Sequence, residues 1–174
     1  MRAEDIRYFS EFLREFQAET DRGAVLVGAA LIDDRLERLL KSHMIEGKEA
    51  DSLINGGAAP LGSFSARSKI AYCLGLITPL EFRECEIIRR VRNVFAHQVH
   101  GLTFTDDRLH DLCSNLQANT PSGQRFGGDA RQLFVNSVVL LSLSLWYRPE
   151  YAKPYAAAER EWQYQLHREE VSEK

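Results

Sequence analysis

Residues 78–100 read T-P-L-E-F-R-E-C-E-I-I-R-R-V-R-N-V-F-A-H-Q-V-H and carry the clearest helix signal in the chain. Thr78 can cap the helix, Pro79 suits its first position, and Glu81 completes a capping box. After the cap, apolar side chains recur at the spacing of one helical face. They are Ile87, Ile88, Val91, Val94 and Phe95. The pattern predicts an amphipathic helix that runs from Thr78 to about residue 97.

The polar face of this predicted helix gathers groups that could form a site. Arg89, Asn93 and His97 share one row at four-residue spacing, and Arg92 flanks that row. An imidazole can transfer a proton, and a guanidinium can stabilise charge on a phosphate. The same side chains could instead be structural, with His97 placed favourably at the negative end of the helix. The sequence alone leaves both readings open.

Apolar periodicity predicts further helices on both sides of this one. Their expected ranges are 3–20, 22–44, 47–54, 64–74, 107–117, 129–147 and 155–170. Asp21 is a candidate N-cap for the second helix, Ser63 or Ser65 for the fourth, and Gly75 is placed to end the fourth. No stretch has a persuasive strand pattern. We therefore predict an all-α fold, a single-domain bundle of about seven helices over residues 1–174.

The helix expected over residues 22–44 begins with the apolar run G-A-V-L-V-G-A-A-L-I, residues 23–32. A run that is apolar on all sides predicts a central, buried helix. Asp33 and Asp34 follow it directly, and an unpaired buried carboxylate would be very costly. We expect Asp33 and Asp34 to take part in a structural ion pair, with Arg92 as an obvious cationic partner.

The composition limits the class of protein. The chain has 174 residues, 44% of them hydrophobic, which is enough for a proper core. A formal net charge of −3 argues against broad, non-specific binding of nucleic acid. The three cysteines have no C-x-x-C spacing, so we expect reduced core thiols. They are Cys73, Cys85 and Cys113.

No sequence pattern calls for a metal, a cofactor or a membrane. The histidines are scattered and have no neighbouring cysteines, so no metal site is expected. The longest apolar runs, 24–32 and 133–147, fall short of the roughly 20 apolar residues that cross a bilayer. The N-terminus M-R-A-E-D is too acidic for a targeting peptide. These features predict a soluble, cytoplasmic protein.

The hexapeptide R-N-V-F-A-H, Arg92 to His97, resembles the R-x4-H signature of HEPN domains. These are all-α modules, and many of them cleave RNA without a metal at a site assembled across a dimer. The resemblance implies a HEPN-like bundle with Arg92, Asn93 and His97 as the catalytic set. Arg89 and Arg90 are then the candidate phosphate-binding residues. The implied activity is a metal-independent endoribonuclease, or RNA binding where catalysis has been lost.

A second resemblance covers more of the chain. It rests on four blocks, which are residues 22–40, 60–77, 88–97 and 103–113. Together they resemble the mannitol operon repressor family, with a family-like core over 22–117 and further helices at 129–147 and 155–170. The resemblance implies an all-α regulatory protein that represses transcription of a sugar-alcohol uptake operon.

The segment Ala71–Pro79 has the Ala-x3-Gly spacing of a helix-turn-helix corner, and an arginine-bearing helix follows it. A recognition helix would need apolar residues where this one has Glu81 and Glu84, and these acids would repel phosphate. The sequence therefore predicts an ordinary helical corner, and direct DNA binding is not expected. We expect a homodimeric regulator that acts through a protein partner, with RNA as the alternative.

Overall fold

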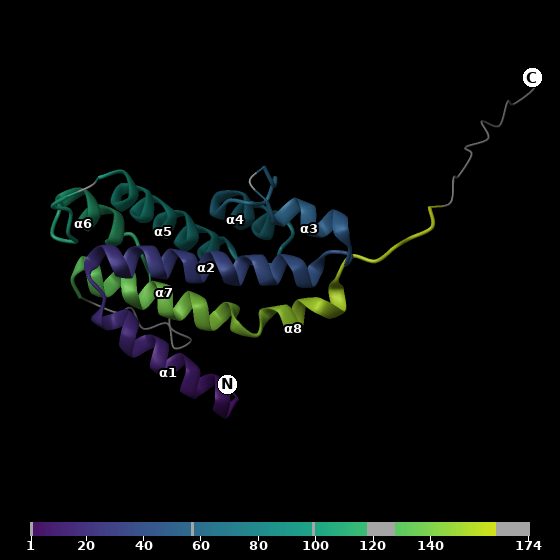
Figure 1. Ribbon diagram of the computed structural model, residues 1–174, viewed down its shortest axis with the longest axis horizontal. Coiled ribbons are helices and arrows are strands. Elements are labelled where there is room, and N and C mark those ends of the chain that lie inside the picture. Colours follow the sequence, from purple (N-terminus) through teal and green to yellow (C-terminus); the bar gives the residue numbers. More distant parts are fainter. Residues whose placement is uncertain (1, 57, 99, 118–127, 163–174) are drawn as a thin grey trace, which may run out of the picture.

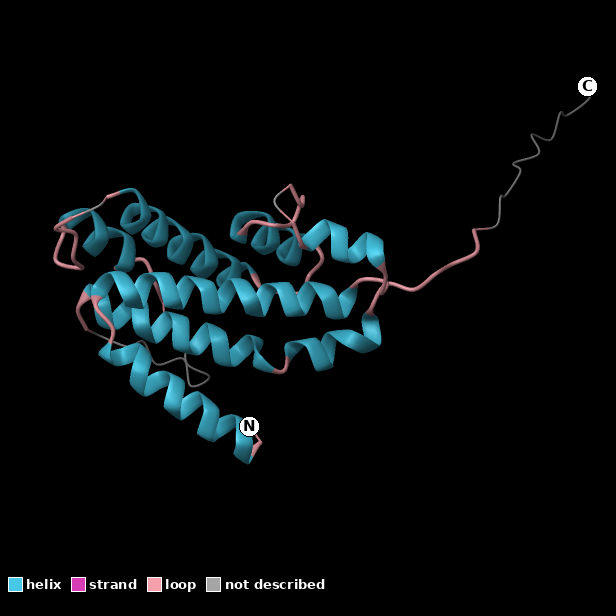
Figure 2. Cartoon of the chain, viewed as in Figure 1, coloured by secondary structure: helices cyan, strands magenta, loops and turns pink. Residues whose placement is uncertain are grey.

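The computed structural model describes residues 2–56, 58–98, 100–117 and 128–162 (Figure 1). Within these ranges the chain forms helices and loops and contains no strand (Figure 2). The elements are α1 (Ala3–Ala18), α2 (Asp21–His43), α3 (Lys48–Ile54), α4 (Phe64–Cys73), α5 (Pro79–His97), α6 (Asp107–Cys113), α7 (Ala130–Trp146), α8 (Arg148–Ala152) and the 3-10 helix η1 (Lys153–Tyr155). The predicted all-α bundle is confirmed.

Capping boxes fix the starts of α5 and α7. At α5 the Thr78 hydroxyl accepts a hydrogen bond from the Glu81 backbone N–H, and the Glu81 carboxylate accepts one from the Thr78 N–H. Asp129 and Gln132 make the same reciprocal pair at α7. Each box satisfies two backbone donors that have no partner inside the helix. The box at α5 confirms the sequence prediction, and α7 begins where the expected range 129–147 places it.

The prediction that Asp21 caps α2 is wrong, because α2 begins at Asp21 itself. Its N-cap is Thr20, whose hydroxyl accepts a hydrogen bond from the Gly23 backbone N–H. The Asp21 carboxylate is instead used in long-range contacts, accepting from the Phe104 backbone N–H at 3.0 Å and from Arg131 at 3.1 Å. Asp21 therefore ties α2 to α7 and to the loop before α6.

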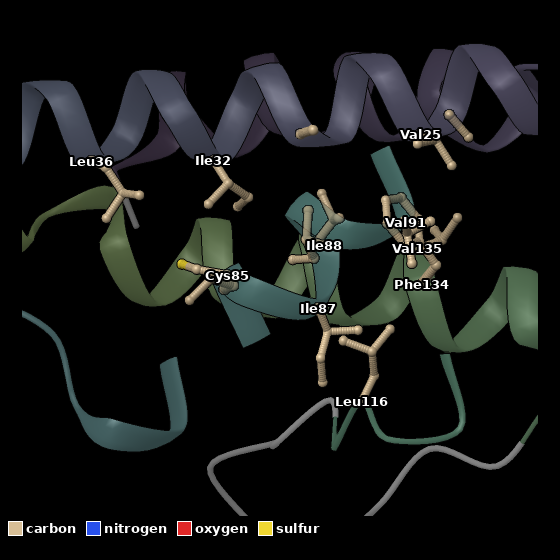
Figure 3. Close-up of a cluster of buried hydrophobic side chains, with 14 of the residues drawn as sticks. Val25, Ile32, Leu36, Cys85, Ile87, Ile88, Val91, Leu116, Phe134 and Val135 are labelled. Atoms are coloured by element: carbon tan, nitrogen blue, oxygen red, sulfur yellow. The ribbon is translucent and has the colours of Figure 1, made fainter. Parts of the chain in front are cut away.

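Helix α2 is the central element of the bundle, with α1, α4, α5, α7 and α8 packed around it. Figure 3 shows the side chains of its inner face directed toward α5 and α7. Val25, Ile32 and Leu36 are fully buried there, and Ile88 and Phe134 meet them from the two neighbouring helices. Burying one such side chain contributes about 1.5–3 kcal/mol, so this seam holds the fold together.

Close approach of α1 and α7 to α2 depends on Gly28. A Cβ atom at this position would lie 3.1 Å from Val138, 3.2 Å from Phe16 and 3.3 Å from Phe134. These contacts are tighter than ordinary side-chain packing. The absence of a side chain at Gly28 therefore lets two aromatic rings fill the space between the three helices.

The prediction that the first half of α2 is buried on every side is wrong in part. Leu26 is 41% exposed, Val27 is 37% exposed and Ala30 is also exposed. The neighbouring helices cover the sides that carry Val25 and Ile32 and leave a strip of α2 at the surface. The apolar pattern identified a central helix without showing how many neighbours would cover it.

The helix predicted over 155–170 is wrong for its described part. After α7 the chain forms the short α8 and η1, and residues 156–162 have no helical structure. Pro149 and Pro154 each lie at the start of a new short element, because neither has the N–H that would continue the helix before it. The Ala157 N–H donates to the His43 carbonyl at 2.8 Å and ties this segment to the end of α2. Residues 163–170, and residues 118–127 of the loop between α6 and α7, lie outside the described ranges.

The cysteines divide by burial. Cys85 and Cys113 are buried, and burial raises the pKa of Cys113 to about 12. Cys73 is exposed, so the prediction of a third core thiol is wrong. It is the last residue of the short α4, where the chain turns at the surface. Among the described helices, none combines the length and apolarity that a bilayer span requires.

Candidate functional site

The C-terminal half of α5 separates two surface depressions. The larger, which we call the α5–α6 groove, has a volume of about 1020 Å³. It is lined by Arg90, Asn93, Val94, His97, Gln98, Arg108, Asp111, Leu112 and Asn115. The smaller, the α2–α5 hollow, has a volume of about 370 Å³. It is lined by Leu26, Ala29, Ala30, Asp33, Gly62, Ser63, Phe64, Arg89, Arg92 and Asn93. Helix α5 contacts both α6 and α2, and Figure 1 shows α5 and α6 side by side along the N-terminal half of α2.

The three residues of the predicted catalytic set do not share one depression. Arg92 lines the α2–α5 hollow, His97 lines the α5–α6 groove, and Asn93 lines both. Five residues along a helix correspond to a rotation of about 140°, which places Arg92 and His97 on different sides of α5. The Arg92 guanidinium donates to the Asn93 side-chain oxygen at 3.2 Å. One copy of the chain therefore does not direct Arg92 and His97 at a common point, and their catalytic role stays a prediction.

The two candidate phosphate-binding arginines also differ. Arg89 makes two hydrogen bonds to the Glu86 carboxylate, at 3.1 and 2.8 Å, and this contact raises the pKa of Arg89. Arg90 is exposed and has no ion-pair partner among the described residues. The charge of Arg89 is thus locally balanced, whereas that of Arg90 is available to a ligand in the α5–α6 groove.

Asp33 and Asp34 each form an ion pair, but neither pairs with Arg92. Asp33 contacts Arg67 of α4 at 2.9 Å, and Asp34 contacts Arg38 one turn along α2 at 2.8 Å. Arg67 also contacts Glu37 at 2.8 Å and is only 8% exposed. The suggested Arg92 partner is therefore wrong, because α4 brings a buried guanidinium to this face of α2 while Arg92 is exposed.

The end of α5 is held in place by Arg22, a residue that the sequence reasoning did not single out. Its guanidinium donates to the Phe95 carbonyl and to the Gln98 carbonyl, the latter at 2.5 Å. It also lies 6.0 Å from the centroid of the Phe95 ring. These contacts satisfy carbonyls that the helix end leaves without an internal partner. They fix the C-terminal end of α5, and with it His97, to the start of α2.

The acids of the α4–α5 corner point into the protein. Glu84 is 5% exposed and accepts a hydrogen bond from the Gln117 backbone N–H at 2.9 Å. Glu81 accepts from Arg148 at 2.6 Å and from Ser144 at 3.1 Å. Burial would raise the pKa of Glu81, but the hydrogen bonds from Arg148, the Thr78 N–H and Ser144 outweigh it and lower that pKa. The N-terminal half of α5 therefore packs on its own chain and is not presented as a recognition helix.

A third depression was not anticipated from the sequence. It has a volume of about 650 Å³ and lies between the α4–α5 turn and the α8–η1 segment. Leu74, Tyr151 and Tyr155 line it and are 45%, 74% and 79% exposed. Because the sequence predicts a polar helix from residue 155, it does not indicate this aromatic surface. The described residues contain no group of histidine, cysteine and acidic side chains that could hold a metal.

The chain is similar to known mannitol repressors. The family model "Mannitol repressor" matches residues 17–125, which include α2 to α6. The mannitol operon repressors of Escherichia coli strains K12 and O6:H1 are each 36% identical to this chain over 53 residues. That match covers 30% of this chain and 27% of each relative, so it spans about a quarter of the length of the curated relatives.

One solved structure has the same fold over most of the chain. It is the X-ray structure of the MtlR–HPr complex from Escherichia coli, with a TM-score of 0.63. The match covers 78% of this chain and 96% of the other chain, at 21% sequence identity. At this level of identity the likeness concerns the fold.

Proposed function

Because this chain belongs to the mannitol repressor family, we propose that it regulates transcription of a sugar-alcohol uptake operon by binding a protein partner. The match of the family model to residues 17–125 carries the proposal. The α4–α5 corner supports the protein route, since Glu81 and Glu84 are used in internal contacts and leave no DNA-reading face there. The net charge of −3 also disfavours a regulator that binds duplex DNA by itself.

The relative of known structure suggests which partner to test first. That relative is described as a complex of MtlR with HPr, and we propose an HPr-type protein as a partner of this chain. Deleting the gene should raise expression of the sugar-alcohol uptake operon in its own organism. Titration calorimetry of the purified chain with that organism's HPr should give saturable binding. Unchanged operon expression after deletion would refute the regulatory function, whatever the calorimetry shows.

A direct DNA route makes a different prediction. If the chain bound the operator by itself, a labelled operator duplex would shift at low salt, and the shift would weaken when Arg89 and Arg90 are changed to Ala. We expect no shift with the purified chain alone. A salt-sensitive shift that depends on these arginines would show that the partner is not needed.

The alternative function is a HEPN-type endoribonuclease. Because Arg92 and His97 lie on different sides of α5, such a site would need groups from a second copy. The test is incubation with structured RNA in EDTA, beside the variants His97→Ala and Arg92→Ala. We expect no cleavage by the unmodified chain. The homodimer also stays a prediction, and light scattering of the purified chain tests it.

A further inference from the structure

We propose that the α5–α6 groove is a docking site for an acidic peptide segment of a partner protein. The inference rests on the proposed function in one respect, that the chain works through a protein. It goes further by naming the surface and the chemistry of the segment that the surface accepts.

The charge of the groove is the first argument. Arg90 and Arg108 are both exposed, and neither has an ion-pair partner among the described residues. The imidazole of His97 lines the same groove. Asp111 is the acid that lines the groove, and it lies 3.9 Å from the imidazole of His110. On a chain with a net charge of −3 this is a local positive surface. Guanidinium groups bind carboxylates through two parallel hydrogen bonds, which gives the contact a defined geometry.

The amides of the groove are the second argument, because they suit a peptide backbone. The Asn115 side-chain nitrogen donates to the Asp111 carbonyl at 2.7 Å, which leaves its oxygen free to accept. The Asn93 oxygen accepts from Arg92, which leaves its nitrogen free to donate. An extended peptide offers both an N–H donor and a carbonyl acceptor at each residue. The half-buried Val94 and Leu112 provide an apolar floor between these amides.

The rigidity of both walls is the third argument. Arg22 fixes the C-terminal end of α5 by its bonds to Phe95 and Gln98. Helix α6 is anchored by the buried Leu109 and Cys113. A site whose walls are already in place loses less conformational entropy when it binds.

The same lining argues against RNA as the occupant. Proteins bind single-stranded nucleic acid by stacking bases on aromatic rings beside a basic groove. Among the described residues, no Phe, Tyr or Trp side chain lines the α5–α6 groove. Asp111 repels any anion beside it, so the groove suits a ligand whose negative charges can be confined to the two arginines. A segment with carboxylates at a few positions suits two arginines better than a polyanion with a charge at every residue.

The test selects ligands from a random dodecapeptide library displayed on phage. The chain is immobilised through its C-terminus, since the last described residues extend from the end of the bundle opposite α6 (Figure 1). We expect the selected peptides to be enriched in Asp and Glu. Fluorescence polarisation of labelled winners should then show at least tenfold weaker binding to the double variant Arg90→Glu/Arg108→Glu.

A matched double variant controls for overall charge. Arg83→Glu/Arg14→Glu also reverses two exposed arginines, but neither residue lines the groove. Both double variants change the formal net charge from −3 to −7, because each reversal removes two units. Binding to the control should stay within about twofold. Arg90→Gln/Arg108→Gln, which adds no acids, repeats the measurement if the charge reversal unfolds the chain.

Three outcomes of the peptide and RNA binding measurements overturn the proposal. One is that the selected peptides are not enriched in Asp and Glu. Another is that both double variants lose peptide binding equally. The third is a labelled single-stranded RNA that binds through Arg90 and Arg108 while no acidic peptide does. Failure of the regulatory function is seen separately, in the deletion strain. If Arg90→Glu/Arg108→Glu does not weaken partner binding, the groove is not the docking site. The proposed regulatory function would be unaffected by that result.

Discussion

The two halves of α5 carry charges that are used in opposite ways. In the N-terminal half, Glu81 and Glu84 face inward and bind Arg148 and the Gln117 backbone. In the C-terminal half, Arg90, Arg92 and His97 are exposed on a helix whose end is anchored. The first set of charges is committed to the fold, and the second is available to a partner. A charge pattern in sequence therefore acquires a role only when the neighbouring helix is known.

The largest effect on stability is expected at Arg67, which is buried, whereas Arg92 is exposed. Arg67→Ala removes the ion-pair partner of Asp33 and one of the two partners of Glu37, which keeps Lys41 at 2.8 Å. Breaking a fully buried ion pair costs about 3–5 kcal/mol, and we expect a smaller loss of about 2–3 kcal/mol because the Asp33 and Glu37 side chains are 28% and 25% exposed. Urea unfolding followed by circular dichroism measures it. Arg92→Ala, at an exposed position, is the matched control and should change the free energy of unfolding by less than about 0.5 kcal/mol. Equal losses of unfolding free energy in both variants would contradict the view that buried charges stabilise the fold and exposed charges do not.

A smaller effect is expected at Glu81, and it should depend on pH. Glu81→Gln weakens the contact with Arg148 and one half of the capping box, at about 1–2 kcal/mol near pH 7. The folded state lowers the pKa of Glu81. Its ionised form therefore adds stability above the unfolded pKa, and this stability is lost as the pH falls through the folded pKa. Denaturant midpoints for both proteins should converge in acid. A difference that persists at pH 2 would show that the carboxylate charge is not the cause.

These two predictions also show what the sequence could and could not supply. Helix periods and capping boxes depend on near neighbours in the chain, so α5 and α7 begin where the sequence predicts. The partner of Asp33 depends on which helix lies beside α2. Arg67 and Arg92 carry the same charged group, so residue type does not distinguish them. The sequence prediction names Arg92, whereas Asp33 pairs with Arg67. Periodicity identifies the apolar face of a helix but not its neighbour.

The candidate site divides in the same way. The sequence places Arg89, Asn93 and His97 in one helical row, because i, i+4 spacing is local, but in the structure the arginines and His97 do not all share one depression. Their separation into two depressions depends on α6 and on the start of α4, which pack on either side of α5. The contact of Arg22 with the end of α5, and the third depression beside Tyr151, each bring together residues that are far apart in the sequence. The sequence therefore does not predict them.

Thiol reactivity tests the burial pattern independently of charge. Cys73 is exposed, whereas Cys85 and Cys113 are buried and burial raises the pKa of both thiols. The thiolate is the reactive form, so a thiol reagent should label Cys73 rapidly in the native chain and the other two only after denaturation. Mass spectrometry of the labelled peptides measures this. Rapid native labelling of Cys85 would mean that the core around the N-terminal half of α5 opens readily.

The smallest stability effect belongs to the C-terminal half of α5, where the functional effect should be largest. Arg90→Ala removes an exposed guanidinium with no ion-pair partner among the described residues, so the free energy of unfolding should change by less than about 0.5 kcal/mol. Glu81→Gln should do the reverse, weakening the fold while leaving the α5–α6 groove and its ligand unaffected. Measuring unfolding and peptide binding on both variants gives a double dissociation between the halves of one helix. If Arg90→Ala instead destabilised the chain as much as Glu81→Gln, Arg90 would have an internal role, and the groove would lose one of the two charges on which its affinity for acidic segments depends.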